Sequence, residues 1–85
     1  MKSRGLSYVT DYEGDNQWLY VDGKLVTSAH TISAESWISI IKNYKNFSDI
    51  RSFRLTEEFE NRVDCDFNLV PVSFSEFLDT DIREY

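Results

Sequence analysis

The stretch YVDGKLVTSAHTIS, residues 20–33, contains the strongest turn signal of the chain. Asp22-Gly23 is a typical two-residue hairpin turn, because both of its central positions need a positive φ. The segments QWLYV before it (17–21) and KLVTS after it (24–28) are rich in the β-branched and aromatic residues that strands favour. A hairpin of two antiparallel strands is therefore predicted.

The residues before this hairpin add a further strand. LSYVTDYE (6–13) has strand composition, and the GDN that follows it (14–16) indicates a turn. The chain is therefore expected to open as a three-stranded meander.

The residues after the hairpin predict a helix over 33–46. Ser33 is a good N-cap, and Ile32 and Trp37 have the spacing of a hydrophobic staple around it. One apolar face follows the helical period, and it consists of Trp37, Ile40, Ile41 and Tyr44.

The second half of the chain is predicted to contain two more strands and a short helix. Apolar and polar residues alternate over about 50–57 and 62–69, with a short helix capped by Thr56 as an alternative between them. Ser73 and Glu76 form a capping box within residues 70–82. We expect one domain, 1–85, of class α+β. Its order is β-β-β-α-β-β-α, with about five antiparallel strands, the main helix on one face and a short C-terminal helix.

The net charge of −6 comes entirely from the last third of the chain. Residues 1–56 carry six acidic and seven basic side chains, a net charge of +1, whereas residues 57–85 carry nine acidic and two basic ones, a net charge of −7. Direct binding to nucleic acid is disfavoured by this balance, and attraction to a basic protein is favoured.

Several classes of protein are disfavoured by the composition. There is no apolar run of membrane-spanning length, and the basic start MKSRGLSYVT lacks the apolar stretch of a secretory signal. One cysteine and one histidine cannot build a zinc site, so no metal or cofactor is expected. A cytoplasmic protein is the simplest interpretation.

His30 and Cys65 are the residues most suited to catalysis, but neither lies in a recognised nucleophile motif. His30 falls between a strand and a helix cap, where a structural or surface role is expected. Cys65 alternates with Val63 and Phe67, which predicts a buried thiol. We therefore expect no catalytic residue and a protein that is not an enzyme.

The acidic side chains of the last third are the main candidates for a binding site. Asp64 and Asp66 share one face of the predicted 62–69 strand, where alternate residues repeat at about 6–7 Å, near the spacing of phosphates on a nucleic-acid strand. If the C-terminal helix folds back beside them, one acidic surface results, and the alternative is an ordinary solvated surface. Its expected members are Glu57, Glu58, Glu60, Asp64, Asp66, Asp79 and Asp81.

Trp18 and Tyr20 share one face of the 17–21 strand, and Leu19 and Val21 share the other. Two apolar faces indicate either a central strand covered on both sides or an exposed contact surface. In the second case Trp18 or Tyr20 could anchor a partner.

The segment from Asp11 to Ile41 resembles small uncharacterised proteins of bacteria and phages. These have a Y-x-D-G-K-L-V hairpin, matched here from Tyr20 to Val26, then a histidine, here His30, and an apolar-acidic helix. The resemblance implies a prokaryotic or phage origin and no particular activity. In size and charge the chain also resembles small acidic inhibitors, namely anti-CRISPR, anti-restriction and immunity proteins.

The resulting hypothesis is a non-enzymatic, protein-binding inhibitor. Its acidic last third would block the basic site of a nuclease or another nucleic-acid-binding protein, with Trp18 or Tyr20 as an anchor. The alternative is a structural protein that self-associates through the sheet edge or the aromatic face, for example as a homodimer. A small enzyme or ligand carrier centred on His30 is a third hypothesis.

Overall fold

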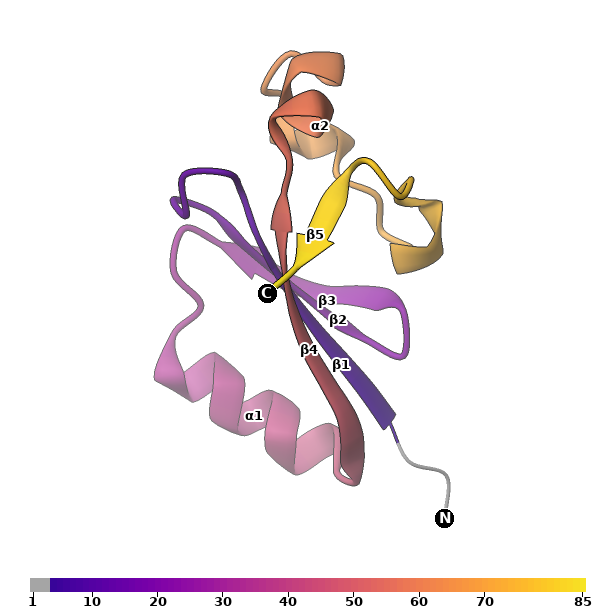
Figure 1. Cartoon of the computed structure of the whole chain (residues 1–85). Coiled ribbons are helices and arrows are strands. Elements are labelled where there is room, and N and C mark those ends of the chain that lie inside the picture. Colours follow the sequence, from indigo (N-terminus) through magenta and orange to yellow (C-terminus); the bar gives the residue numbers. More distant parts are fainter. Residues whose placement is uncertain (1–3) are drawn as a thin grey trace.

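The computed structural model describes residues 4–85, which form a five-stranded sheet with one long helix and several short ones (Figure 1). The strands are β1 (Arg4–Thr10), β2 (Gln17–Val21), β3 (Lys24–Ala29), β4 (Phe47–Leu55) and β5 (Ile82–Glu84). The helices are α1 (Ala34–Tyr44) and α2 (Glu57–Arg62), with the 3-10 turns η1 (Phe67–Leu69) and η2 (Phe74–Glu76). The sheet order is β3-β2-β1-β4-β5. The expected α+β class is confirmed, and the sheet has five strands as expected, although one of the five is not a strand that the sequence predicted.

The predicted meander and its hairpin are confirmed. β1 pairs antiparallel with β2, and β2 pairs antiparallel with β3. Asp22 and Gly23 join β2 to β3 with φ of 52° and 83°, the positive values that this turn needs.

Helix α1 begins as predicted. The Ser33 side chain accepts a hydrogen bond from the Ser36 N–H (3.2 Å), so it is the N-cap. The buried side of α1 packs on one face of the sheet, around Leu19 and Val21 of β2. The core of this face consists of Leu6, Leu19, Val21, Ile32 and Ile40.

The prediction of a purely antiparallel sheet is wrong, because β4 runs parallel to β1. The chain leaves the meander at β3, crosses the sheet as α1, and returns beside β1 in the same direction. A helical crossover is the usual connection between parallel neighbours. The sheet is therefore mixed.

The predicted strand over 62–69 is also wrong. Thr56 caps the short helix α2, which was the alternative, and the chain then turns through Asp64 and Cys65 with φ of 54° and 55°. These left-handed residues are incompatible with a strand. The segment after β4 instead covers the second face of the sheet, and its core with that face consists of Val9, Trp18, Tyr20, Phe53, Leu55, Phe59, Val63 and Val70.

The predicted C-terminal helix is replaced by the three-residue turn η2, and its Ser73 makes no side-chain cap. Phe74 and Phe77 from this region pack on Tyr20 instead, with ring centroids 5.4 and 6.0 Å away. The chain ends as β5, an edge strand that the sequence did not predict and that pairs antiparallel with β4.

Candidate partner-binding surface

Helix α2 carries three glutamates at the end of the sheet where β4 finishes. Thr56 accepts a hydrogen bond from the Phe59 N–H (3.2 Å), and Phe59 is buried in the core. The cap and this anchor fix the helix, so that Glu57 and Glu58 lie exposed in its first turn. Carboxylates are favourable there because they complement the helix dipole.

The β1–β2 loop, residues 11–16, reaches the same end of the sheet. Asp11 is buried and holds the loop, since its carboxylate accepts hydrogen bonds from the N–H groups of Asp15 (2.6 Å) and Asn16 (3.2 Å). Gly14 has a φ of 84°, a value that favours glycine. The exposed members of this loop include Tyr12 and Glu13.

One hydrogen bond joins the loop to the helix. The Tyr12 N–H donates to Glu60 Oε2 at 2.8 Å. Partial burial raises the pKa of Glu60, this hydrogen bond opposes the rise, and the nearby charges of Asp11, Glu13 and Glu57 add to it. The carboxylates of loop and helix are thus close enough to repel one another. We call the surface formed by Glu13, Glu57, Glu58 and Glu60 the acidic end.

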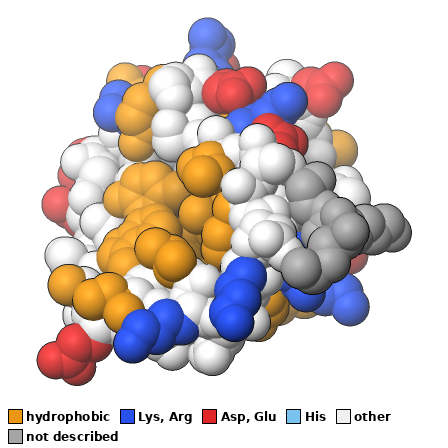
Figure 2. Space-filling view, turned by 90° about the horizontal axis from the view of Figure 1, so that it is seen from below, with side chains coloured by type: hydrophobic (Ala, Val, Ile, Leu, Met, Phe, Trp, Pro, Cys, Tyr) orange, Lys and Arg blue, Asp and Glu red, His pale blue; other side chains and the backbone are white. Residues whose placement is uncertain are grey.

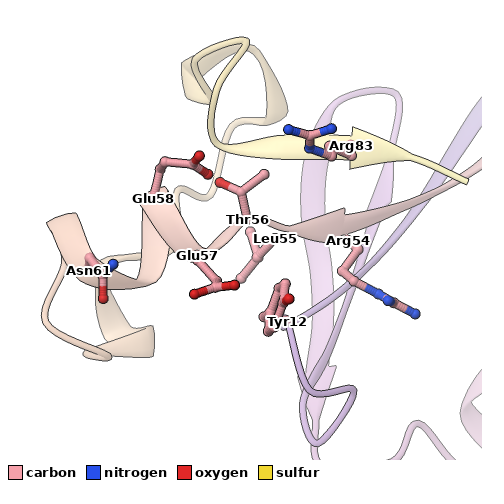
Figure 3. A pocket seen from close by; sticks show the side chains of 8 residues that line it. All are labelled: Tyr12, Arg54, Leu55, Thr56, Glu57, Glu58, Asn61 and Arg83. Carbon is pink, nitrogen blue, oxygen red and sulfur yellow. The ribbon is translucent and has the colours of Figure 1, made fainter.

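A pocket of about 590 Å³ opens beside the acidic end (Figure 3). The Tyr12 ring and the Glu57 carboxylate lie next to each other in it, and a hydrogen bond from the hydroxyl to Glu57 raises the pKa of Tyr12. Arg83 of β5 lies above, and the side chain of Arg54 extends away from Glu57. The lining residues are Tyr12, Arg54, Leu55, Thr56, Glu57, Glu58, Asn61 and Arg83.

This arrangement is chemically suited to a cationic side chain of a partner. Glu57 and Glu58 supply carboxylates for charge-assisted hydrogen bonds, and Tyr12 supplies an aromatic surface for a cation–π contact. Arg54 and Arg83 are directly opposite one another in the β4–β5 pairing, and both are exposed. They add two cations to the opposite wall, where a partner's carboxylate could bind.

The acidic residues that were predicted to form one surface lie in different parts of the structure. Glu57, Glu58 and Glu60 come together in the acidic end. Asp64 and Asp66 are exposed but lie in the turn after α2, not on a strand, so the argument from phosphate-like strand spacing does not apply to them. Asp66 caps η1 by accepting a hydrogen bond from the Asn68 N–H (3.1 Å). Asp79 is exposed in the turn before β5.

Asp81 is not available to a partner, in contrast to the prediction. Its side chain is 2% exposed and pairs with the Arg62 guanidinium at 2.7 Å. Its second oxygen accepts a hydrogen bond from the Leu78 N–H at 2.7 Å. Asp81 therefore fixes the turn that leads into β5.

Trp18 and Tyr20 are core residues, so the interpretation of β2 as a strand covered on both sides is confirmed. Their exposed fractions are 5% and 0%. Burial raises the pKa of Tyr20, and its hydroxyl donates to the Pro71 carbonyl at 2.6 Å. Neither ring can anchor a partner, and the exposed aromatic of the acidic end is Tyr12.

His30 and Cys65 are both exposed. His30 Nδ1 lies 3.3 Å from the Asp15 carbonyl, a surface contact of the kind expected. The prediction of a buried Cys65 is wrong, because the left-handed turn points its side chain outwards instead of continuing the alternation of a strand.

The sequence did not indicate that the β1–β2 loop belongs to the acidic surface. Residues 1–56 are nearly neutral as a group, which obscures the local run DYEGD over 11–15. That run, three carboxylates around a glycine turn, was the available signal.

Within residues 4–85 no group of three or more metal-ligating side chains comes together. None of the helices in that range is long and apolar enough to span a membrane. Comparison with known proteins finds no matching family, no matching curated protein and no matching solved structure.

Proposed function

We propose that this protein is a non-enzymatic binding module that inhibits a nucleic-acid-handling protein by docking its acidic end onto a basic surface. The inhibitor would act in counter-defence or in toxin neutralisation. The observation that carries the proposal is the convergence of carboxylates from two distant chain segments, joined by the hydrogen bond between Tyr12 and Glu60.

This convergence has an energetic cost. Partial burial, with a smaller contribution from the charges of Asp11, Glu13 and Glu57, raises the pKa of Glu60, which means that the folded protein holds an ionised group there less favourably than water does. A basic partner surface would relieve this repulsion on binding. Electrostatic complementarity of this kind speeds encounter and selects the partner.

The pocket beside the acidic end supports a specific contact as well as a general attraction. Glu57 and Tyr12 are positioned together in it, so a lysine or arginine side chain from the partner would find a carboxylate and an aromatic ring at once. Contacts that lose their water at the centre of an interface carry most of the binding energy, so this pair is the proposed centre of the contact.

A capture experiment with a charge-reversal variant tests the proposal. The wild-type chain is immobilised and exposed to lysate of the native host at low and high salt, and bound proteins are eluted with duplex DNA. We expect DNA to release a nucleic-acid-binding protein, and we expect high salt and Glu58→Lys each to weaken its capture by at least about tenfold.

Glu35→Lys is the matched control. Glu35 and Glu58 are both exposed and both occupy the second position of a helix, after the caps Ser33 and Thr56. The two substitutions change the net charge equally, so only the location differs. Equal loss of capture in both variants, or capture that ignores salt and DNA, would contradict the proposal.

A further inference from the structure

The pocket beside the acidic end is lined by side chains of both charges. Glu57 and Glu58 of α2 supply carboxylates, and the ring of Tyr12 lies beside Glu57 (Figure 3). Arg83 of β5 and Arg54 of β4 supply guanidinium groups, and the two residues face each other directly in the β4–β5 pairing. A ligand that uses the whole pocket must therefore carry a cation and an anion.

Arg83 is the basic side chain of this pocket that is available to an anion. It is exposed, and its guanidinium forms no ion pair or ring contact within residues 4–85. Arg54 differs, because its guanidinium lies 5.0 Å from the centroid of the Tyr85 ring and extends away from Glu57. Like charges that face each other on paired strands destabilise the pair, so an anion bound at Arg83 reduces its repulsion from Arg54.

Glu57 is the carboxylate best placed for a cation. The hydroxyl of Tyr12 hydrogen-bonds to it, and this bond holds the ring beside the carboxylate. A lysine or arginine side chain at this position gains a charge-assisted hydrogen bond and a cation–π contact together.

We propose that this pocket binds an arginine or lysine that forms the C-terminus of a partner chain. The basic side chain pairs with Glu57 beside the Tyr12 ring, and the terminal α-carboxylate accepts hydrogen bonds from Arg83. The inference rests on the proposed function and deepens it, because it names the group that the partner inserts beside the acidic end.

A single terminal residue suits the pocket better than two charged residues on a folded surface. Opposite charges that are neighbours on a surface can pair with each other, and that pairing is lost when they bind elsewhere. In a terminal arginine the extended side chain keeps the guanidinium away from the α-carboxylate, so both groups arrive unpaired. The pocket volume of about 590 Å³ is within the range of small-ligand sites.

The side of the molecule that lies away from α2 serves as an internal reference. Figure 2 shows a continuous apolar patch there, with Lys and Arg side chains around it, on the side where α1 lies. Ile38 and Ile41 of α1 are each 53% exposed. Exposed apolar surface attracts ligands without charge specificity, so the amide signals of these two residues report general adsorption.

Nuclear magnetic resonance titration of the nitrogen-15-labelled chain with acetylated peptides tests the proposal. The probe is acetyl-glycyl-glycyl-arginine with a free carboxylate. One comparison peptide is its C-terminal amide, and the other is acetyl-arginyl-glycyl-glycine, which carries the same two charges on different residues. The probe is expected to shift the amide signals of Tyr12, Glu57 and Arg83 with a dissociation constant below about 10 mM, and each comparison peptide to bind at least about tenfold more weakly.

Two pairs of variants assign the ends of the ligand. Arg83→Gln is expected to bind the acid and the amide equally, because the anion site is lost while Glu57 remains. Arg51→Gln makes the same change at an exposed position on the other face of β4 and is expected to keep the tenfold preference. Glu57→Gln is expected to weaken both peptides, and Glu35→Gln on α1 to weaken neither.

The outcomes for this inference and for the proposed function are separate. Equal binding of acid and amide by the wild type overturns the inference, and so does an absence of shifts at about 10 mM or a response confined to Ile38 and Ile41. Arg83→Gln that keeps the preference also overturns it. These results leave the capture of a nucleic-acid-binding protein unchanged, whereas a failed capture beside an intact peptide preference contradicts the proposed function alone.

Discussion

At the scale of single residues, Asp81 shows how misleading a count of charges is. It belongs to the acidic last third, yet it is buried and receives hydrogen bonds from Arg62 and the Leu78 N–H. Its role was not visible in the sequence, because its cationic partner lies 19 residues away and only the fold brings the two together.

Replacing Asp81 by alanine is expected to destabilise the protein by about 2–4 kcal/mol. The change leaves the Leu78 N–H without its acceptor, removes the charged partner of the half-exposed Arg62, and deletes a carboxylate that is itself only 2% exposed. Asp81→Asn should lose less, because an amide oxygen can still accept from Leu78. Urea unfolding followed by tryptophan fluorescence measures the difference.

Asp79→Ala is the control for this prediction, since Asp79 lies two residues earlier and is exposed. Its substitution should change the free energy of unfolding by less than about 0.5 kcal/mol. If Asp79→Ala and Asp81→Ala were equally harmful, the stabilising role of Asp81 would be refuted.

At the scale of elements, Thr56 connects helix α2 with the turn that precedes β5. Its hydroxyl caps α2 and also donates to the Thr80 carbonyl at 2.5 Å, next to the turn that Asp81 holds. Thr56 is itself buried, and so is its hydrogen bond to the Phe59 N–H, which water therefore cannot readily replace.

Thr56→Val keeps the shape of this side chain and removes the hydroxyl. It is expected to cost about 1–3 kcal/mol, because the Phe59 N–H and the Thr80 carbonyl lose their partner together. Thermal unfolding by circular dichroism measures the effect. Thr31→Val, at an exposed position outside any helix or strand, is the control, and an equal shift in both variants would show that the Thr56 hydroxyl contributes nothing specific.

The elements that the sequence predicted correctly are those with local causes. Asp22-Gly23 sets a hairpin by itself, and Ser33 caps α1 with groups three residues away. The alternation of apolar and polar residues over 62–69 is not by itself enough to fix a strand. A strand also needs a neighbour to pair with, and the left-handed Asp64 and Cys65 turn the chain away from the sheet.

At the scale of the whole molecule, local sequence patterns could not predict which distant segments of the chain lie next to each other. β4 runs parallel to β1 because the chain crosses the sheet through α1 before it returns beside β1. The acidic end depends on the contact of Tyr12 with Glu60, which lie 48 residues apart. The sequence could predict that the last third of the chain is acidic. It could not predict that the β1–β2 loop adds its carboxylates to the same surface.

The acidic end should therefore make the stability of the molecule depend on pH in a definite direction. The pKa of Glu60 is raised above its ordinary value of 4.5 in the folded state. Between 4.5 and that raised value the folded state binds more protons than the unfolded state, so Glu60 makes the free energy of unfolding fall as pH rises through this window. The contribution of Glu60 is least favourable above the window.

Glu60→Gln removes the charge and keeps an oxygen that can accept from the Tyr12 N–H. At pH 7 and low salt the variant is expected to melt about 1–3 °C above the wild type, and this difference should vanish as pH falls below 4.5. Added salt screens the charges of Asp11, Glu13 and Glu57, so it should reduce the share of this difference in melting temperature that they cause. The share caused by the burial of Glu60 should remain. Glu35→Gln on α1 is the control and should show no such pH-dependent gain. A Glu60→Gln variant that is no more stable than the wild type at pH 7, or whose gain persists at pH 4, would mean that neither burial nor the neighbouring carboxylates disfavour the ionised form of Glu60 in the folded protein.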